Sequence, residues 1–285
     1  MKNIKFLFAT LAVTAFLTSC SNNDDNSPLL VGENPMADYN MLTSIEANSH
    51  AIEVYSEKDG FTIGYNELFV RIKDASTDSY IENAEITWIP MMHMLEKMHS
   101  CPNSEISTTE NASVYNGFVV FQMPGNPEEY WELALEYSIN GQTYNATERI
   151  EVKAPADGRK TVNSFMGSDG SRYVLAMMPF APEVKVNDFS AMLFKMESMM
   201  YFPPVEDYSI GIDPRMPGMG NHSSPNNVDL SFDAVSKRYM GKVSLTMTGY
   251  WKINLKLMNE ADEVLMGEDV TEENEESSLF FGIEF

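Results

Sequence analysis

Hydrophobic and polar residues alternate along many short segments of this chain. The segments are rich in Val, Ile, Phe, Tyr or Trp and are bounded by Gly, Asn, Asp or Pro, which is typical of β-strands. In the first half they occupy residues 50–56, 67–74, 84–90, 117–123 and 130–137. In the second half they occupy residues 172–180, 189–197, 208–213, 241–247, 250–258 and 278–285. No amphipathic helix of four turns interrupts them, so the pattern predicts an all-β chain made of two tandem immunoglobulin-like β-sandwich domains.

A polar stretch at residues 153–164, which contains Pro155 and Gly158, is the best candidate for a boundary between these domains. It predicts a first domain over residues 38–154 and a second over residues 155–285.

An internal repeat runs across this boundary. Each copy has a proline, a Met-rich loop and a His-Ser-x-Pro-Asn segment, followed by a Tyr-x-Gly strand start, a strand that ends in Met, and a Trp-bearing strand. The order predicts two copies of one fold. The corresponding positions are His99 and His222, Gly117 and Gly241, Met123 and Met247, and Trp131 and Trp251.

The N-terminus predicts the cellular compartment. Residues 1–19 combine two early lysines, a short apolar run and a small-residue end, as a secretory signal peptide does. The tetrad Leu-Thr-Ser-Cys resembles a bacterial lipobox, which implies that Cys20 is diacylated, and two acyl chains anchor a protein stably. Residues 20–37 then form a flexible polar tether. Because Ser21 is not an aspartate, the resemblance favours a lipoprotein of the outer membrane, facing the periplasm or the cell surface. The alternative is cleavage elsewhere, with Cys20 a free thiol.

The net charge of the chain limits the classes of partner that it can bind. The chain has 42 acidic and 19 basic residues and a formal charge of −23, and loss of residues 1–19 removes two lysines and no acid, giving −25. Such a surface repels nucleic acid, so we exclude DNA and RNA as partners. The partners that remain are the membrane, through the lipid anchor, and a copper-handling or other envelope protein.

Methionine and histidine gather in two segments that we expect to be exposed loops. Thioether and imidazole are uncharged ligands that suit Cu(I). The second loop offers Met216, Met219 and His222 at intervals of three, and Met247 ends the following strand of the repeat as a possible fourth donor. The first loop offers four candidate donors: His93, Met94, Met98 and His99. These sets predict copper sites, the second loop being the primary one.

The runs MPGMGNH and GKVSLTMTGYWKINLKL, at the second loop and after it, resemble the YtkA-like or FixH-like domain. The resemblance covers residues 183–258 well and residues 61–138 more loosely. It implies an immunoglobulin-like sandwich in an extracytoplasmic protein, with a role near copper.

A glycan-binding lipoprotein would need exposed aromatic residues on one face, and the pattern shows none clearly, so one main alternative to a copper protein stays open. The loop methionines would equally serve as a hydrophobic cap over the end of each sandwich, and the protein would then be a non-catalytic structural or protein-interaction lipoprotein without metal. An enzyme is not expected, because the sequence contains no nucleophile elbow, zinc-protease helix motif, phosphate-binding loop or Cys-x-x-Cys pair.

Overall fold

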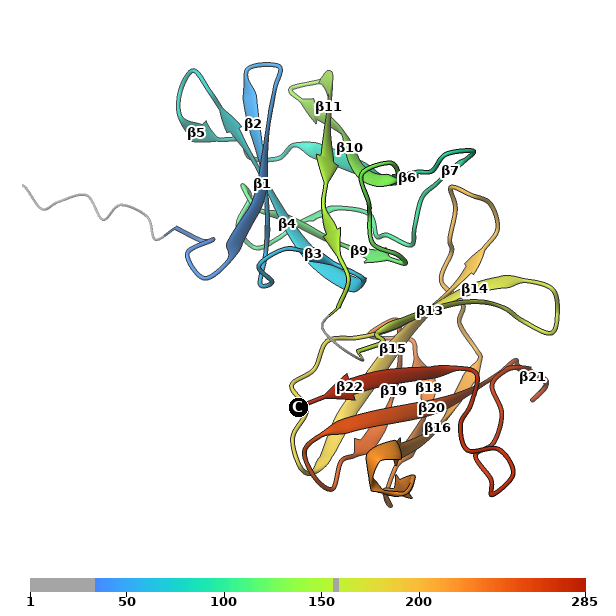
Figure 1. Cartoon of the computed structure of the whole chain (residues 1–285). Helices are drawn as coiled ribbons and strands as arrows, with labels where there is room; N and C mark the ends of the chain where they lie inside the picture. The colour runs from blue at the N-terminus through green and yellow to red at the C-terminus, as the bar shows by residue number, and fades with distance from the viewer. Residues whose placement is uncertain (1–33, 156–158) are drawn as a thin grey trace, which may run out of the picture. The chain divides into compact units, whose positions relative to one another are not determined.

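The computed structural model describes residues 34–155 and 159–285 (Figure 1). In these two ranges the regular structure consists of β-strands and one 3₁₀ turn, Pro217–Met219, which confirms the all-β prediction. No helix in the described ranges is long and apolar enough to span a membrane. The predicted signal peptide, the lipidation site Cys20 and the tether up to residue 33 lie outside the described residues and stay predictions.

The strands of the first half form two antiparallel sheets and a short parallel pair (Figure 1). The first sheet has the order β1-β2-β4-β9-β8, and its strands are β1 (Asn40–Ala47), β2 (His50–Ser56), β4 (Gly64–Asp74), β8 (Ser107–Thr108) and β9 (Tyr115–Phe121), with β5 (Ser79–Tyr80) beside β4. The second has the order β11-β10-β6-β7, and its strands are β6 (Glu85–His93), β7 (Met98–His99), β10 (Tyr130–Ile139) and β11 (Gln142–Ile150). The parallel pair is β3 (Phe61–Thr62) with β12 (Val152–Lys153).

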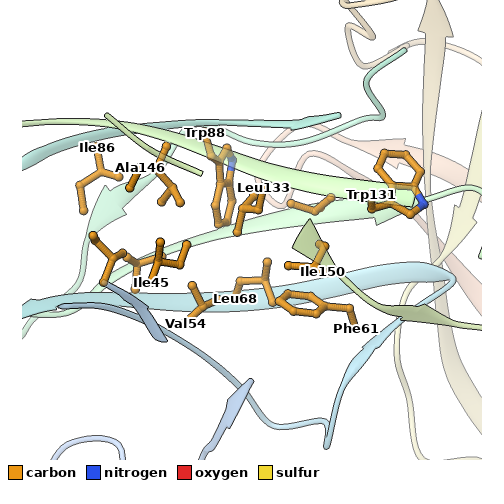
Figure 2. Packing of buried hydrophobic residues seen from close by; sticks show 14 of the residues in the cluster. Ile45, Val54, Phe61, Leu68, Ile86, Trp88, Trp131, Leu133, Ala146 and Ile150 are labelled. Atoms are coloured by element: carbon orange, nitrogen blue, oxygen red, sulfur yellow. The ribbon is translucent and has the colours of Figure 1, made fainter. Parts of the chain in front are cut away.

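The inner faces of these two sheets enclose a core (Figure 2). Along β6 every second residue from Ile86 to Met92 is buried, as the alternation predicts for a strand with one face against a core. In Figure 2, Val54 and Leu68 of the first sheet point toward Trp88 and Leu133 of the second. Burying such side chains stabilises the fold by about 1.5–3 kcal/mol each.

The strands of the second half form one continuous sheet with the order β13-β14-β15-β19-β18-β16-β20-β21, in which β22 also pairs with β20 and β17 with β16. Its strands are β13 (Val162–Met166), β14 (Arg172–Met177), β15 (Val186–Met196), β16 (Ser209–Met216), β17 (His222–Ser223), β18 (Val228–Asp233), β19 (Arg238–Ser244), β20 (Tyr250–Met258), β21 (Val264–Met266) and β22 (Phe280–Glu284). Among the described strands, no ladder joins this sheet to the sheets of the first half. Residues Pro35–Phe285 nevertheless form one compact unit, and the boundary after residue 154 stays a prediction.

The same strand order occurs in both halves. The series β1-β2-β4-β9 corresponds to β13-β14-β15-β19, and β6-β10-β11 corresponds to β16-β20-β22. One difference between the halves is the link between the two series. In the second half, β18 pairs with both β16 and β19 and so joins the two series, whereas in the first half β7 pairs with β6 and β8 pairs separately with β9.

Equivalent tryptophans make equivalent hydrogen bonds in the two halves. The indole Nε1 of Trp131 donates to the carbonyl of Met123 at 2.9 Å, and the indole Nε1 of Trp251 donates to the carbonyl of Met247, also at 2.9 Å. Both tryptophans are fully buried. A buried indole needs a partner for its N–H, and in each half the repeat's methionine supplies it through its backbone. The repeat predicts that these methionines end strands, but Met123 and Met247 lie just beyond β9 and β19.

Gly241, on β19, lies against the backbone of the neighbouring strand β18. A Cβ at this position would meet the carbonyl oxygen of Val228 at 2.4 Å and that of Asp229 at 2.9 Å. We expect Gly241→Ala to lower the free energy of unfolding by about 1–3 kcal/mol, as other overpacking changes do, measured by urea denaturation. Gly218→Ala is the control, because nothing lies within 4 Å of its Cβ position. Equal stability of both variants would contradict the close approach.

Candidate functional site

The predicted second loop is partly strand, and its candidate donors lie in different environments. Met216 ends β16, is 5% exposed and belongs to the core of the second half, while Met247 is partly buried against that core. Met219 lies in the 3₁₀ turn and is 58% exposed, and His222 is exposed on β17. The Met216 methyl packs over the Gly249 backbone, 3.1 Å from the position of a Cβ there. Two of the four side chains are therefore used in packing.

The predicted first loop is a β-hairpin, and strand alternation divides its donors between two faces. Met92 pairs with His99, and His93 pairs with Met98. Directly opposed residues share a face and consecutive residues do not. His99 therefore lies on the face of buried Met92, whereas His93 and Met98 lie on the outer face. Met94 follows at the turn, partly buried against the core.

On the outer face, His93 is held by aromatic and charged neighbours. Its ring stacks on Tyr130 with centroids 4.8 Å apart, and the Arg149 guanidinium lies 4.1 Å from the same Tyr130 ring. The buried Nε2 atom of His93 lies 3.4 Å from Glu132 Oε1 but has no hydrogen-bond partner within the described residues. The contact becomes an ion pair only when the imidazole is protonated. This pattern indicates a packed surface rather than an open metal ligand.

One ring nitrogen of His99 makes a hydrogen bond, and the other makes none among the described residues. Its Nδ1 lies 2.7 Å from the Ser100 carbonyl oxygen. Because a carbonyl only accepts, Nδ1 carries the proton, and in the neutral ring Nε2 keeps its lone pair. None of the described hydrogen bonds uses Nε2. The ring packs edge-on against Trp131 at 5.8 Å, which restricts its orientation. In metal sites, a hydrogen bond at one ring nitrogen orients the histidine so that the other nitrogen can bind the ion.

A cavity of about 300 Å³ brings His99 together with three methionines, Met123, Met196 and Met199. Met123 follows β9, Met196 ends β15, and Met199 lies in the turn after it. The Ser100 amide donates to the Met199 carbonyl at 2.8 Å, so backbone contact fixes that turn beside His99. His99 and three methionines thus line a single space.

The lining of this cavity contains no carboxylate but includes the cations Lys97 and Arg172. Hard cations such as Ca²⁺ and Mg²⁺ need oxygen ligands, and the two positive charges oppose a divalent ion more strongly than a monovalent one. In the described part of the chain no three His, Cys, Asp or Glu side chains gather into a metal site. The lining therefore offers no carboxylate ligand to a hard cation.

Three of these four residues were not singled out as donors from the sequence. The repeat pairs Met123 with Met247, which was a candidate donor, so a signal for Met123 was present. Met196 and Met199 fall in a segment whose hydrophobic pattern predicts core strand. Their proximity to His99 depends on tertiary contact, for which the sequence carries no local signal.

Cys101 is not an available ligand. Its side chain is fully buried in the core of the first half and forms no disulfide. Burial raises the pKa of the Cys101 thiol well above its usual value, whereas the thiolate is the form that binds metal.

Comparison of the chain with protein-family models and with curated proteins gives no match.

Proposed function

We propose that this protein is an envelope lipoprotein of β-sandwich architecture that binds Cu(I) and holds it for relay or sequestration. The observation that carries the proposal is the cavity in which His99, with Nε2 uncommitted, is joined by Met123, Met196 and Met199. The predicted loops contribute one of these residues, His99, so the proposal moves the primary site from the second loop to this cavity.

The donor set favours Cu(I) over other ions. Thioether sulfur selects the soft Cu(I) ion, and imidazole suits copper in general. Thiolates would be the stronger ligands, but an extracytoplasmic compartment oxidises them, and the one cysteine of the described chain is buried away. Because these donors are uncharged, the occupied site would carry only the +1 charge of the ion, next to Lys97 and Arg172.

The predicted location supplies the context for this activity. A diacylated Cys20 and the polar tether after it would hold the sandwiches at the outer membrane, facing the periplasm or the cell surface. The tether is shorter than the predicted 20–37, because the compact unit begins at Pro35 and Met36 is only 3% exposed. We propose no catalytic step, since ion binding and transfer to a copper-handling envelope protein need only exchangeable ligands. Because the mature chain would carry a charge of −25, it would attract a partner with a cationic surface.

An anaerobic competition titration with a chromogenic Cu(I) chelator tests the proposal and locates the site. The material is the chain from Ser21, because Pro35–Phe285 is a compact unit with its own cores. We expect His99→Ala with Met196→Leu to weaken Cu(I) binding by at least about 100-fold, beyond the roughly 10–100-fold that loss of a supporting partner costs. Leucine preserves the volume of methionine.

The matched control is His222→Ala with Met219→Leu in the second loop, which we expect to bind Cu(I) as the wild type does. Loss of binding in this control alone would return the site to the second loop. Absence of Cu(I) binding by the wild type would overturn the proposal and favour the alternative, a protein-interaction lipoprotein. The exposed turn residues Met199, Met200 and Tyr201, at 41%, 46% and 59% exposure, would then be the first surface to examine.

A further inference from the structure

A second cavity, of about 710 Å³, is lined by cationic side chains, although the chain as a whole is acidic. Three cationic side chains line it: Lys58, from the loop after β2, and Lys153 and Arg159. Lys58 is half-buried, while Lys153 and Arg159 are exposed. The chain has only 19 basic residues against 42 acidic ones. Three cations at one cavity therefore contrast with the excess of acidic residues in the chain as a whole.

Among the described residues, no carboxylate forms an ion pair with these cations. Lys58 Nζ donates to the Tyr65 carbonyl at 2.6 Å and to Thr62 Oγ1 at 3.0 Å, which are uncharged acceptors. The Arg159 guanidinium donates to the Glu284 backbone carbonyl at 3.2 Å. None of the ion pairs formed by the described residues includes Lys58, Lys153 or Arg159, although Asp59 and Glu284 also line the cavity.

Burial makes the charge on Lys58 costly. It lowers the pKa of Lys58 to about 8, since desolvation disfavours the ammonium form. An anion in the cavity would offset this cost, because an opposite charge nearby favours the protonated amine.

Much of the remaining lining is apolar. Met177, Phe180, Ile283 and the two prolines Pro179 and Pro182 contribute to it. Small-molecule sites typically combine an apolar wall with a few placed polar groups, in a volume of about 300–1,000 Å³. A bare inorganic anion would use the cations and leave this wall in water, whereas an aliphatic body would cover it.

We propose that this cavity binds an amphipathic organic anion, an aliphatic carboxylate, with its head group at Lys58, Lys153 and Arg159 and its chain along Phe180 and Met177. This site is separate from the Cu(I) cavity, shares no lining residue with it, and does not depend on the proposed copper function.

Calorimetric titration with decanoate, below its micelle-forming concentration, tests the site on the chain from Ser21. We expect wild-type protein to bind decanoate and to bind the neutral probe 1-decanol at least about tenfold more weakly, since one charge interaction is worth about 1.4 kcal/mol or more when partly buried. Lys153→Gln and Lys58→Met should each weaken decanoate binding by a similar factor. The control Lys237→Gln removes a cation that lies outside the cavity and pairs with Glu206, so it should leave binding unchanged.

The pH dependence isolates Lys58. As pH rises from 7 to 9, through its pKa of about 8, Lys58 loses its charge, so decanoate affinity of the wild type should fall. Lys58→Arg should remove this fall, because arginine stays protonated. Undetectable decanoate binding, equal affinity for decanoate and 1-decanol, or equal weakening by the Lys237→Gln control would each overturn the proposal.

Discussion

Replacing Trp251 by alanine is expected to lower the free energy of unfolding by about 3–5 kcal/mol, the range for a large aromatic side chain removed from a core. Trp251 has no exposed surface and lies among the core residues of the second half. Its indole also donates to the Met247 carbonyl at 2.9 Å. The variant thus loses the packing of the ring and leaves a partly buried carbonyl without its donor, which costs further stability.

Urea denaturation followed by circular dichroism measures this loss. Trp251→Phe should cost less than Trp251→Ala, since it keeps an aromatic ring and loses chiefly the indole N–H. Tyr201→Ala is the control, because that side chain is 59% exposed and surface changes usually shift stability by less than about 0.5 kcal/mol. A loss for Trp251→Ala no larger than that for Tyr201→Ala would contradict the assigned core.

The equivalent change in the first half, Trp131→Ala, extends the test to the predicted domain boundary. If residues 38–154 and 155–285 unfold separately, each tryptophan variant should lower only one of two calorimetric transitions. A single transition, lowered by both variants, would contradict independent domains and agree with one cooperative unit.

The sequence predicted the strands best where one face meets the core. The alternation in residues 84–90 predicts a strand, and β6 indeed covers Glu85–His93. The prediction ended too early because Pro90 and the methionines after it were interpreted as the start of a loop. In the structure the alternation continues through Pro90 to Met92, which is fully buried. Pro90 is tolerated there because β6 is paired on only one side at this position: β10 lies opposite Pro90, whereas β7 pairs only with Met92 and His93.

The same strand extension explains why the candidate site was only partly predictable. Once residues 91–93 form strand, His93 and His99 must lie on opposite faces, so the expected convergence of the first loop does not follow. The methionines that line the cavity with His99 are instead Met123, Met196 and Met199, and the Ser100 amide donates to the Met199 carbonyl. A pattern of local hydrophobicity contains no information about that contact.

Met216→Ala is the second substitution for which we expect a large effect, a loss of about 2–5 kcal/mol in the free energy of unfolding. Met216 is 5% exposed within the core of the second half. Met219, three residues further on and 58% exposed, provides the matched control. Met219→Ala should change stability by less than about 0.5 kcal/mol. Chemical denaturation of both variants without metal measures the difference.

Repeating these denaturation curves with one equivalent of Cu(I) separates packing from metal binding at the second loop. An ion that binds only the folded state raises apparent stability according to its affinity. If Met216 serves the core and the ion binds beside His99, the Cu(I)-dependent increase should be the same in wild type, Met216→Ala and Met219→Ala. If both sulfurs were ligands, the two substitutions would reduce that increase alike, even though their metal-free stabilities differ. A selective loss of the increase in these two variants would therefore place the ion at the second loop and remove the argument for the His99 cavity.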